Sequence, residues 1–559
     1  MKKYQFQYSL PEMTRRLFGL AKPIRGYLTV STLASILGNL AHMGLMGFGA
    51  MWILAVSGLA SGSPYLYAVL AILSAAVIVL GRYLEVVFSH IGAYGILAKL
   101  RIRLFECLDR TAPAMMVDRK KGDLLNIAVS DIETLEFFFA HMIGPMFTVF
   151  LLPLTTLLIA GSRHMLYVAA LLPVYLLISV IIPLLALKAG RRIGMKSRES
   201  QGELKSYILE SVYGMRDLQI FGFGPAREAG MLRKNEEVNR AMHGLTMHKQ
   251  VVSALPNFFV YLARILILMI AAYLAGLALN DPVGTILISF ITTASFSSTF
   301  SLTSVVSNLL ETYAAAERFF LIEDAAPAVR EVSQPEDVGP LETIEFDDVT
   351  FSYPGTSTEI LKGASFRLRQ GEHVGIYGES GVGKSTLLRL LLRFYDPNKG
   401  AVRMNGTDLK KLSLKSLHKK IVMLEQETYL FDMSIAENIG ISKPGAAREE
   451  IVRAAERAGI ADFIATLPEG YKTQMGQMNA RLSGGERQRI GIARILLADP
   501  DMIVMDEPTS SLDVLHEQEL LRTLEKEYGG KTILIISHRM STLESCERLV
   551  RMEAGQLQG

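Results

Sequence analysis

The stretch Gly378-Glu379-Ser380-Gly381-Val382-Gly383-Lys384-Ser385-Thr386 decides how the rest of this chain is organised. It follows residues 372–377, which are predicted to form a strand, and precedes residues 387–394, which are predicted to form a leucine-rich helix. In this setting the pattern G-x-x-x-x-G-K-[ST] predicts a phosphate-binding loop, because glycines let backbone N–H groups close around an anion at a helix N-terminus. We expect Lys384 to reach the β- and γ-phosphates and Ser385 to hold Mg²⁺. The stretch therefore predicts ATP or GTP binding.

The composition predicts a membrane protein with a soluble part. Of the 559 residues, 50% are hydrophobic and 20% are charged, and the mean hydropathy is +0.28. A chain of this length is too long for one hydrophobic core, so two or more domains are expected. The net charge of +3 gives no indication of nucleic-acid binding. The two cysteines, Cys107 and Cys546, predict neither a disulfide framework nor a zinc site.

Six apolar stretches are predicted to cross the membrane as helices. The first covers residues 27–57, three more begin near residues 64, 138 and 165, and the last two cover residues 252–277 and 283–306. The helices that begin near residues 64 and 165 are expected to continue far into the cytosol, since an α-helix advances about 1.5 Å per residue. Residues 10–24 mix basic and apolar side chains, which predicts an amphipathic helix at the inner membrane surface.

Basic residues predict the orientation of these spans. The connections 92–125 and 187–250 are rich in Lys and Arg, whereas 58–64 and 277–282 contain none. The positive-inside rule therefore predicts a multi-pass protein of the cytoplasmic (inner) membrane with both termini and the ATPase domain in the cytoplasm.

The domain boundaries follow from a change in composition. Residues 1–323 are predicted to form the transmembrane domain, and residues 324–342, which contain three prolines, a linker. From Thr343 onward, short apolar strands at 344–346, 374–377, 503–505 and 532–536 alternate with helices. The predicted fold is an all-α six-helix transmembrane domain followed by an α/β P-loop nucleotide-binding domain, residues 343–559.

Two acidic residues follow the strand predicted at 503–505. Asp506 is expected to support Mg²⁺, and Glu507 to polarise the water that attacks the γ-phosphate. Two acids after a strand can also form a solvated turn, but the phosphate loop upstream favours the catalytic interpretation. The domain is therefore predicted to hydrolyse the nucleotide.

A second glycine turn, Leu482-Ser483-Gly484-Gly485-Glu486-Arg487-Gln488, also lies at the start of a predicted helix. With this motif the sequence resembles the ATP-binding cassette family, whose signature is LSGGQ or LSGGE. The resemblance covers the whole chain, since six spans followed by one cassette is the arrangement of exporter half-transporters of type IV. It implies that Tyr353 stacks on adenine, that Gln426 senses the γ-phosphate and Mg²⁺, and that His538 contacts the γ-phosphate. It also implies that Asp513 belongs to the D-loop.

The same resemblance implies a dimer that couples ATP hydrolysis to transport. Two cassettes would close head to tail, with each ATP between the phosphate loop of one chain and the 483–485 turn of the other. The tips near residues 117–123 and 209–217 would be coupling helices. One departure is Gln477, where exporters commonly have a Glu before the signature.

The second predicted span contains Arg82-Tyr83-Leu84-Glu85-Val86-Val87-Phe88-Ser89-His90, in which Arg82 and Glu85 are spaced to pair. This stretch resembles the R-Y-x-E-R-x-x-S-H segment of the CydC family. That family provides one subunit of the heterodimeric CydDC transporters, which support cytochrome bd assembly and are described as moving reduced thiols (cysteine, glutathione) or haem. The resemblance implies that His90 ligates haem b and that the partner is CydD-like. A His at the inner end of a span is more commonly an interfacial residue, and Val86 replaces the family's second Arg.

Other functions stay open from the sequence. One is a homodimeric exporter of lipid, peptide or drug, and another is an ATP-dependent membrane sensor without transport. Among the CydC-like possibilities, thiol peptides would require cationic residues in a cavity, whereas haem would require an apolar slot and an axial ligand.

Overall fold

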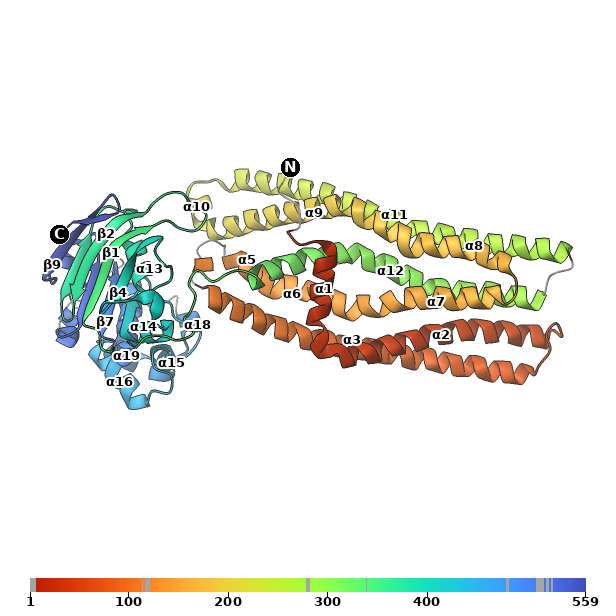
Figure 1. The fold of residues 1–559 in the computed structure, drawn as a ribbon, viewed down its shortest axis with the longest axis horizontal. Coiled ribbons are helices and arrows are strands. Elements are labelled where there is room, and N and C mark those ends of the chain that lie inside the picture. Colours follow the sequence, from red (N-terminus) through yellow and green to blue (C-terminus); the bar gives the residue numbers. More distant parts are fainter. Residues whose placement is uncertain are drawn as a thin grey trace. The chain divides into compact units, whose positions relative to one another are not determined.

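The structure is a computed structural model that describes residues 7–112, 114–115, 121–277, 282–337, 339–478, 482–508, 517–518, 522–523 and 526–558. The chain divides into two compact units, Met1–Arg110 with Asp118–Ala325, and Thr111–Val117 with Ala326–Gly559. The first unit is built of helices, and the second contains both β-sheets (Figure 1).

The first unit consists of long helices joined by short connections. Among the described residues, five helical segments are long and apolar enough to cross a membrane by length and composition, and a sixth apolar stretch, Pro282–Phe296, begins the last helix. The predicted sixth span, 283–306, starts there, and the structure describes its side chains as far as Phe296. The helices of this unit are α1 (Leu10–Leu20), α2 (Arg25–Val56), α3 (Pro64–Thr111), α5 (Lys121–Asn126), α6 (Ile132–Phe137), α7 (Ile143–Gly161), α8 (Met165–Leu176), α9 (Ile182–Tyr213), α10 (Met215–Ile220), α11 (Gly224–Gly276) and α12 (Pro282–Glu323).

Wide helical turns connect several of these helices into continuous segments. One such turn, Ile127–Asp131, joins α5 to α6, another, Phe138–Met142, joins α6 to α7, and a third, Leu177–Ile181, joins α8 to α9. Close packing in the unit depends on small residues. At Gly81 on α3, an added Cβ atom would lie 3.0 Å from the carbonyl oxygen of Ala34 on α2, so a larger residue would push these helices apart.

The predicted long extensions are confirmed by the helix lengths. The helix α3, which begins at residue 64, has 48 residues, and the continuous helical segment that begins at residue 165, Met165–Tyr213, has 49. The tip between α9 and α11 differs from the predicted segment 209–217. The helix α9 continues through Tyr213, Gly214 interrupts it, and the separate helix α10 begins at Met215. Of the other predicted tip, 117–123, residues 117–120 lie outside the described residues.

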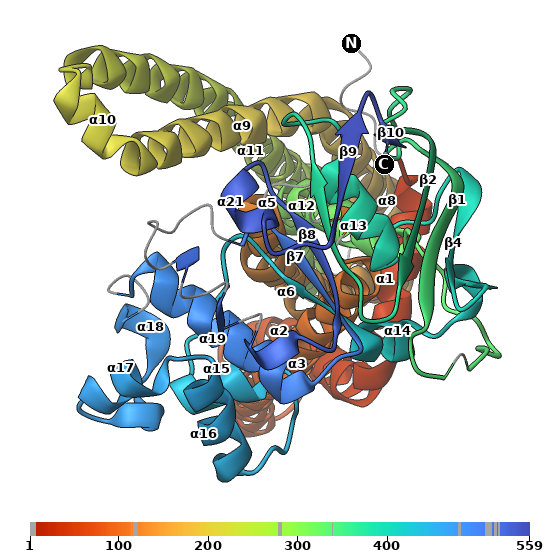
Figure 2. The same ribbon diagram turned by 90° about the vertical axis from the view of Figure 1, so that its left-hand side faces the viewer.

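The second unit contains two sheets. An antiparallel sheet has the order β2-β1-β4-β5, and a six-stranded sheet has the order β10-β9-β3-β8-β7-β6, with only β10 antiparallel to its neighbour (Figure 2). Their strands are β1 (Thr343–Phe351), β2 (Leu361–Arg369), β3 (His373–Tyr377), β4 (Lys399–Met404), β5 (Thr407–Asp408), β6 (Ile421–Leu424), β7 (Met502–Asp506), β8 (Thr532–Ile536), β9 (Arg548–Glu553) and β10 (Gln556–Gln558). All four predicted strands are therefore present.

Short helices surround these sheets, as expected for parallel strands whose two faces are both covered. All five residues of β8 are buried. The helices are α13 (Lys384–Leu391), α14 (Leu414–Lys420), α15 (Ile435–Gly440), α16 (Arg448–Arg457), α17 (Ala461–Thr466), α18 (Met475–Met478), α19 (Gly484–Ala498) and α21 (Met540–Leu543). The helix α13 starts at Lys384, three residues before the predicted start, and ends at Leu391.

The predicted linker, 324–342, is partly fastened to the second unit. Its described residues have no helix or strand, but Leu341 is buried in the core of this unit. The Arg393 guanidinium donates a hydrogen bond to the Arg330 carbonyl oxygen (3.0 Å), and the Glu336 N–H donates to the Lys411 carbonyl oxygen (3.0 Å). This stretch is therefore not a free tether along its whole length.

Candidate nucleotide site

The predicted phosphate loop connects β3 to α13, and its glycines are required by geometry. A Cβ atom at Gly378 would lie 2.3 Å from the Met552 carbonyl oxygen on the neighbouring strand β9. Gly383, which precedes α13, has a φ of 115°, a left-handed value that favours glycine. The buried Lys384 ammonium donates hydrogen bonds to the carbonyl oxygens of Gly378 and Glu379, each at 2.8 Å. The loop thus curls around a cationic group at a helix N-terminus, which is an arrangement suited to phosphate.

Oxygen donors for a divalent cation lie beside this loop. The hydroxyl of Ser385, at the start of α13, hydrogen-bonds the carboxylate of Asp506 at the end of β7. Burial raises the pKa of Asp506, and the nearby Glu507 carboxylate adds to the rise. Hydroxyl and carboxylate oxygens are the ligands that Mg²⁺ prefers, so the residues present fit the ion.

Three predicted site residues follow neighbouring parallel strands. The strands β6, β7 and β8 are in register at Leu424, Met505 and Ile535. Gln426 follows β6 by two residues, Glu507 follows β7 directly, and His538 follows β8 by two residues. Because parallel strands end at one edge of a sheet, these residues lie at the same edge as the phosphate loop.

The structure brings Glu507 and His538 into contact. The His538 Nδ1 atom is 3.1 Å from the Glu507 Oε1 atom. Glu507 has a φ of 48°, which is uncommon for a residue with a side chain, and its N–H donates to the Ile536 carbonyl oxygen at 2.8 Å. Such strained backbone is concentrated at functional sites, where the surrounding structure holds a side chain in a fixed direction. Gln426 has an exposed side chain.

Tyr353 lies next to the phosphate-loop helix. Its hydroxyl is 3.0 Å from the Thr386 hydroxyl and accepts a hydrogen bond from Arg389 at 2.7 Å. Its half-buried ring makes edge contacts with Phe351 and Tyr395, at centroid distances of 5.0 and 5.3 Å. The ring is therefore fixed on three sides at the border of the site.

The glycine turn of the predicted signature forms the N-terminus of α19. The Ser483 hydroxyl accepts a hydrogen bond from the Glu486 N–H (3.2 Å), and the Ser483 N–H donates to the Glu486 carboxylate (2.7 Å). This capping box fixes the turn, with Ser483 exposed, Gly484 half-buried and Gly485 buried. Asp513 and the side chain of Gln477 lie outside the described parts of the chain.

Gln488 closes the signature stretch, but the sequence did not predict a role for it. Gln488 on α19 is only 1% exposed, and its side-chain amide donates to the carbonyl oxygens of Glu425 (3.2 Å) and Gln426 (2.8 Å). It also accepts a hydrogen bond from the Thr428 hydroxyl at 3.2 Å. Gln488 thereby ties the signature helix to the segment that carries Gln426. The spacing in the sequence could have indicated that Gln488 is buried, because it lies four residues before Ile492 and therefore on the same face of the helix.

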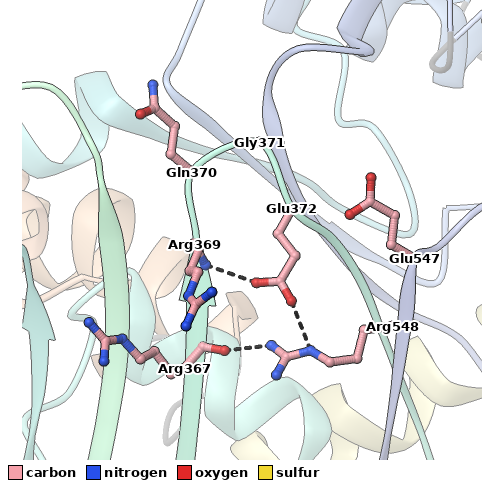
Figure 3. A pocket seen from close by; sticks show the side chains of 7 residues that line it. All are labelled: Arg367, Arg369, Gln370, Gly371, Glu372, Glu547 and Arg548. Carbon is pink, nitrogen blue, oxygen red and sulfur yellow. Dashed lines mark hydrogen bonds and ion pairs between the residues drawn. The ribbon is translucent and has the colours of Figure 1, made fainter.

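A separate pocket of about 540 Å³ lies at the opposite end of β3, near Gly371 and Glu372 (Figure 3). There Arg548 pairs with Glu372 at 2.9 Å and donates to the Arg367 carbonyl oxygen at 2.5 Å. Gly371 and Glu372 lie before the N-terminal end of β3, whereas the phosphate loop follows its C-terminal end, so the two sites are distinct.

His90 lies on α3 in the first unit. Its Nδ1 atom is 2.9 Å from the Val86 carbonyl oxygen, its Nε2 atom is 3.8 Å from the Glu136 carboxylate, and its ring centroid is 5.1 Å from that of His141. One turn earlier, the predicted pair of Arg82 and Glu85 is confirmed at 2.9 Å.

Comparisons with known proteins match both units. Family models described as ABC transporter transmembrane region and ABC transporter match residues 28–303 and 361–510. The chain is 34% identical over 542 residues to a probable ABC transporter ATP-binding/permease protein of Haemophilus influenzae, covering 94% of this chain and 97% of that protein. It is 29% identical over 551 residues to the glutathione/L-cysteine transport system ATP-binding/permease protein CydC of Escherichia coli, covering 96% and 94%. An ATP-dependent lipid A-core flippase of Desulfotalea psychrophila is 30% identical over 495 residues, covering 84% and 82%.

A solved structure of a bacterial Atm1-family ABC exporter with ATP bound has the same fold, with a TM-score of 0.79. At 24% identity it covers 96% of this chain and 95% of that one. This likeness confirms the predicted fold class, a type IV exporter with a helical membrane domain before the nucleotide-binding domain. Since relatives of nearly equal length match both units in the same order, the chain belongs to the ABC transporter family, as an exporter half-transporter that couples ATP hydrolysis to transport.

Proposed function

We propose that this half-transporter uses ATP to move reduced thiols (cysteine or glutathione) or haem across the cytoplasmic membrane, in support of cytochrome bd assembly. The observation that carries the proposal is the similarity to a CydC protein over 96% of the chain. The segment Arg82–His90, with its confirmed ion pair, gives additional support. Both termini and the ATPase unit lie in the cytoplasm, as the distribution of basic residues favours.

In this proposal each ATP is bound between two chains. Lys384 and the backbone of residues 378–386 hold the phosphates, and Ser385, Asp506 and Gln426 hold Mg²⁺. Tyr353 stacks on adenine, while Ser483, Gly484, Gly485 and Asp513 complete the site of the opposite chain. Glu507 polarises the attacking water, and His538 contacts the γ-phosphate; their 3.1 Å contact supports a joint role.

The partner is a second half-transporter, CydD-like rather than a second copy. Support for a partner comes from the tip between α9 and α11. Tyr213 and Phe221 there have 86% and 79% of their surface exposed, and Phe223 is also exposed. An apolar patch of this kind at the end of a charged extension suits docking on another protein.

Haem b is proposed to bind at His90. The contact of its Nδ1 atom with the Val86 carbonyl oxygen fits an imidazole that donates there and keeps a lone pair on Nε2 for iron. The proposal is tested by adding haem to the purified protein: the Soret band should shrink in His90→Ala, and an unchanged spectrum would remove the site.

Transport is tested with inverted membrane vesicles that contain the full chain and its partner. We expect ATP-dependent uptake of radiolabelled cysteine or glutathione that is lost in Lys384→Ala. ATP turnover without uptake of either thiol or of haem would contradict the proposal. In that case ATP-dependent lipid movement in proteoliposomes would favour a lipid exporter, and its absence would favour a sensor without transport.

A further inference from the structure

A polar cavity of about 880 Å³, open to solvent, lies between helices of the first unit. Its walls are formed by α5 with the wide turn Ile127–Asp131, by α9, by α12 and by Leu245 of α11. This volume is within the range of small-molecule sites, which is about 300–1,000 Å³.

The facing walls of this cavity carry opposite charges. The α5 side contributes Asp123 and Asp131, and the α9 side contributes Arg198, Lys205 and Glu210. The Glu210 charge is compensated by Arg227, at 3.1 Å. On α12, Arg318 pairs with both aspartates, at 2.5 Å to Asp123 and 3.1 Å to Asp131. Arg198 on α9 pairs with Glu311, which lies on α12 as Arg318 does, at 3.3 Å. The charges are thus arranged as an acidic wall and a basic wall, each held against α12.

Each wall carries one charged group, Lys205 or Asp123, that has few protein partners among the described residues. The Lys205 ammonium donates to the neutral Asn126 amide oxygen at 3.3 Å, and among the described residues it has no carboxylate within ion-pair distance. On the other wall, Arg318 contacts the Oδ1 atom of Asp123, and within the described chain the Oδ2 atom of Asp123 accepts no hydrogen bond. Both residues are exposed, so an ammonium and a carboxylate oxygen in the lining of one cavity are accessible to a ligand that enters from solvent.

This chemistry selects the class of ligand. Most lining residues are polar or charged, and among the described residues no His, Cys or Met lines the cavity. Haem would require an apolar slot and an axial ligand, and the cavity has neither. A small zwitterion, with one carboxylate and one ammonium, matches the two walls, since charge-assisted hydrogen bonds are the strongest polar contacts available.

We propose that this cavity is a binding site for the transported thiol in its zwitterionic form. The carboxylate of the ligand contacts Lys205 and Arg198, and its ammonium contacts Asp123. This inference rests on the proposed function and selects cysteine-like thiols over haem as the solute that this site receives.

The ligand is tested by calorimetric titration of the full chain, with its partner, in lipid nanodiscs under reducing conditions. The probes are L-cysteine, cysteamine, which lacks the carboxylate, and N-acetylcysteine, whose nitrogen carries no charge. We expect cysteine to bind at least about tenfold more tightly than either analogue, because each analogue leaves one charged wall without its partner. Equal affinities for the three compounds, or no binding of cysteine, would overturn the inference.

The site is tested with Lys205→Glu, which reverses the least satisfied charge. We expect cysteine affinity to fall by about tenfold or more. Lys196→Glu is the matched control, because Lys196 is exposed on the same helix and does not line the cavity. Asp123→Asn should weaken cysteine binding but leave N-acetylcysteine unchanged. Equal cysteine affinity in wild type and Lys205→Glu would overturn the assignment.

Uptake measurements separate this inference from the proposed function. If vesicles take up cysteine with the same KM in wild type and Lys205→Glu, the cavity is not the site although the transporter moves thiols. If the wild-type protein binds cysteine through Lys205 but vesicles take up no cysteine, the binding site is supported and the proposed transport of thiols is contradicted.

Discussion

At the scale of single residues, the contact between Glu507 and His538 carries the proposed hydrolysis. Glu507→Gln keeps the size and backbone of the side chain but removes the carboxylate that would polarise water. A positioned general base typically contributes about 10²–10⁴-fold, so we expect kcat for ATP hydrolysis to fall by about 100-fold or more. ATP binding should remain, because Lys384 and the phosphate loop are unchanged. Phosphate release and binding of a fluorescent ATP analogue check the two parts.

Glu544→Gln is the control for this prediction, since Glu544 is exposed at the end of α21. It should hydrolyse ATP at the wild-type rate. Normal kcat in Glu507→Gln would show that another group activates the water.

Gln488 gives a second prediction at the residue scale. Gln488→Leu removes the donors that satisfy the carbonyl oxygens of Glu425 and Gln426. Each hydrogen bond of this buried side chain contributes about 0.5–1.5 kcal/mol, so we expect a lower Tm of the nucleotide-binding unit and reduced ATPase activity. Differential scanning fluorimetry measures the first effect. Gln370→Leu, at an exposed turn, should change neither quantity, and an unchanged Tm in Gln488→Leu would contradict the role assigned to its hydrogen bonds.

At the scale of elements, the sequence allowed the regular parts to be predicted and missed those that depend on tertiary contacts. The strand β8 was predicted with its observed bounds, because a run of buried β-branched and apolar residues has few alternatives. Gly214 and the wide turns were not predicted, because a turn of helix differs little in composition from its neighbours. The convergence of Gln426, Glu507 and His538 at one sheet edge required the strand order, which the sequence did not contain. The polar cavity beside α5, α9 and α12 was missed for the same reason, since its charged residues come from separate helical segments.

The N-terminal helix α1 shows such a tertiary contact and allows a test of pH dependence. Its Met13 and Leu17 are fully buried, and Arg16 pairs with Glu323 (2.8 Å) and Asp324 (2.5 Å) at the end of α12. The hydrogen bond from Arg16 lowers the pKa of Asp324. A depressed pKa in the folded state stabilises the protein above the unfolded pKa of about 3.9, and this contribution is lost as pH falls through the lower folded value.

We therefore expect Arg16→Gln to lower the apparent Tm by about 2 °C at pH 7, as a partly exposed ion pair contributes little. The difference from wild type should shrink as the pH is lowered below about 4. Arg15→Gln, at an exposed position of the same helix, should match wild type at every pH. A Tm difference that stays constant down to pH 3 would mean that Arg16 acts through its packing over the Phe320 ring and not through its charge.

At the scale of the whole molecule, each proposed ATP site is shared between two chains. Two variants with different defects can therefore form one intact site when they are combined in one dimer. Lys384→Ala damages the phosphate loop, and Gly485→Asp damages the signature turn, so a dimer made of either variant alone has two defective sites. A mixed dimer has both defects in one site and none in the other. We therefore expect each variant to be inactive by itself and co-purified mixed dimers, isolated with two different tags, to recover measurable ATPase activity. If the chain works only with a different half-transporter, the two changes are divided between the two chains. Inactive mixed dimers with normal assembly would argue against shared sites, because a site built within one chain stays defective whichever partner it meets.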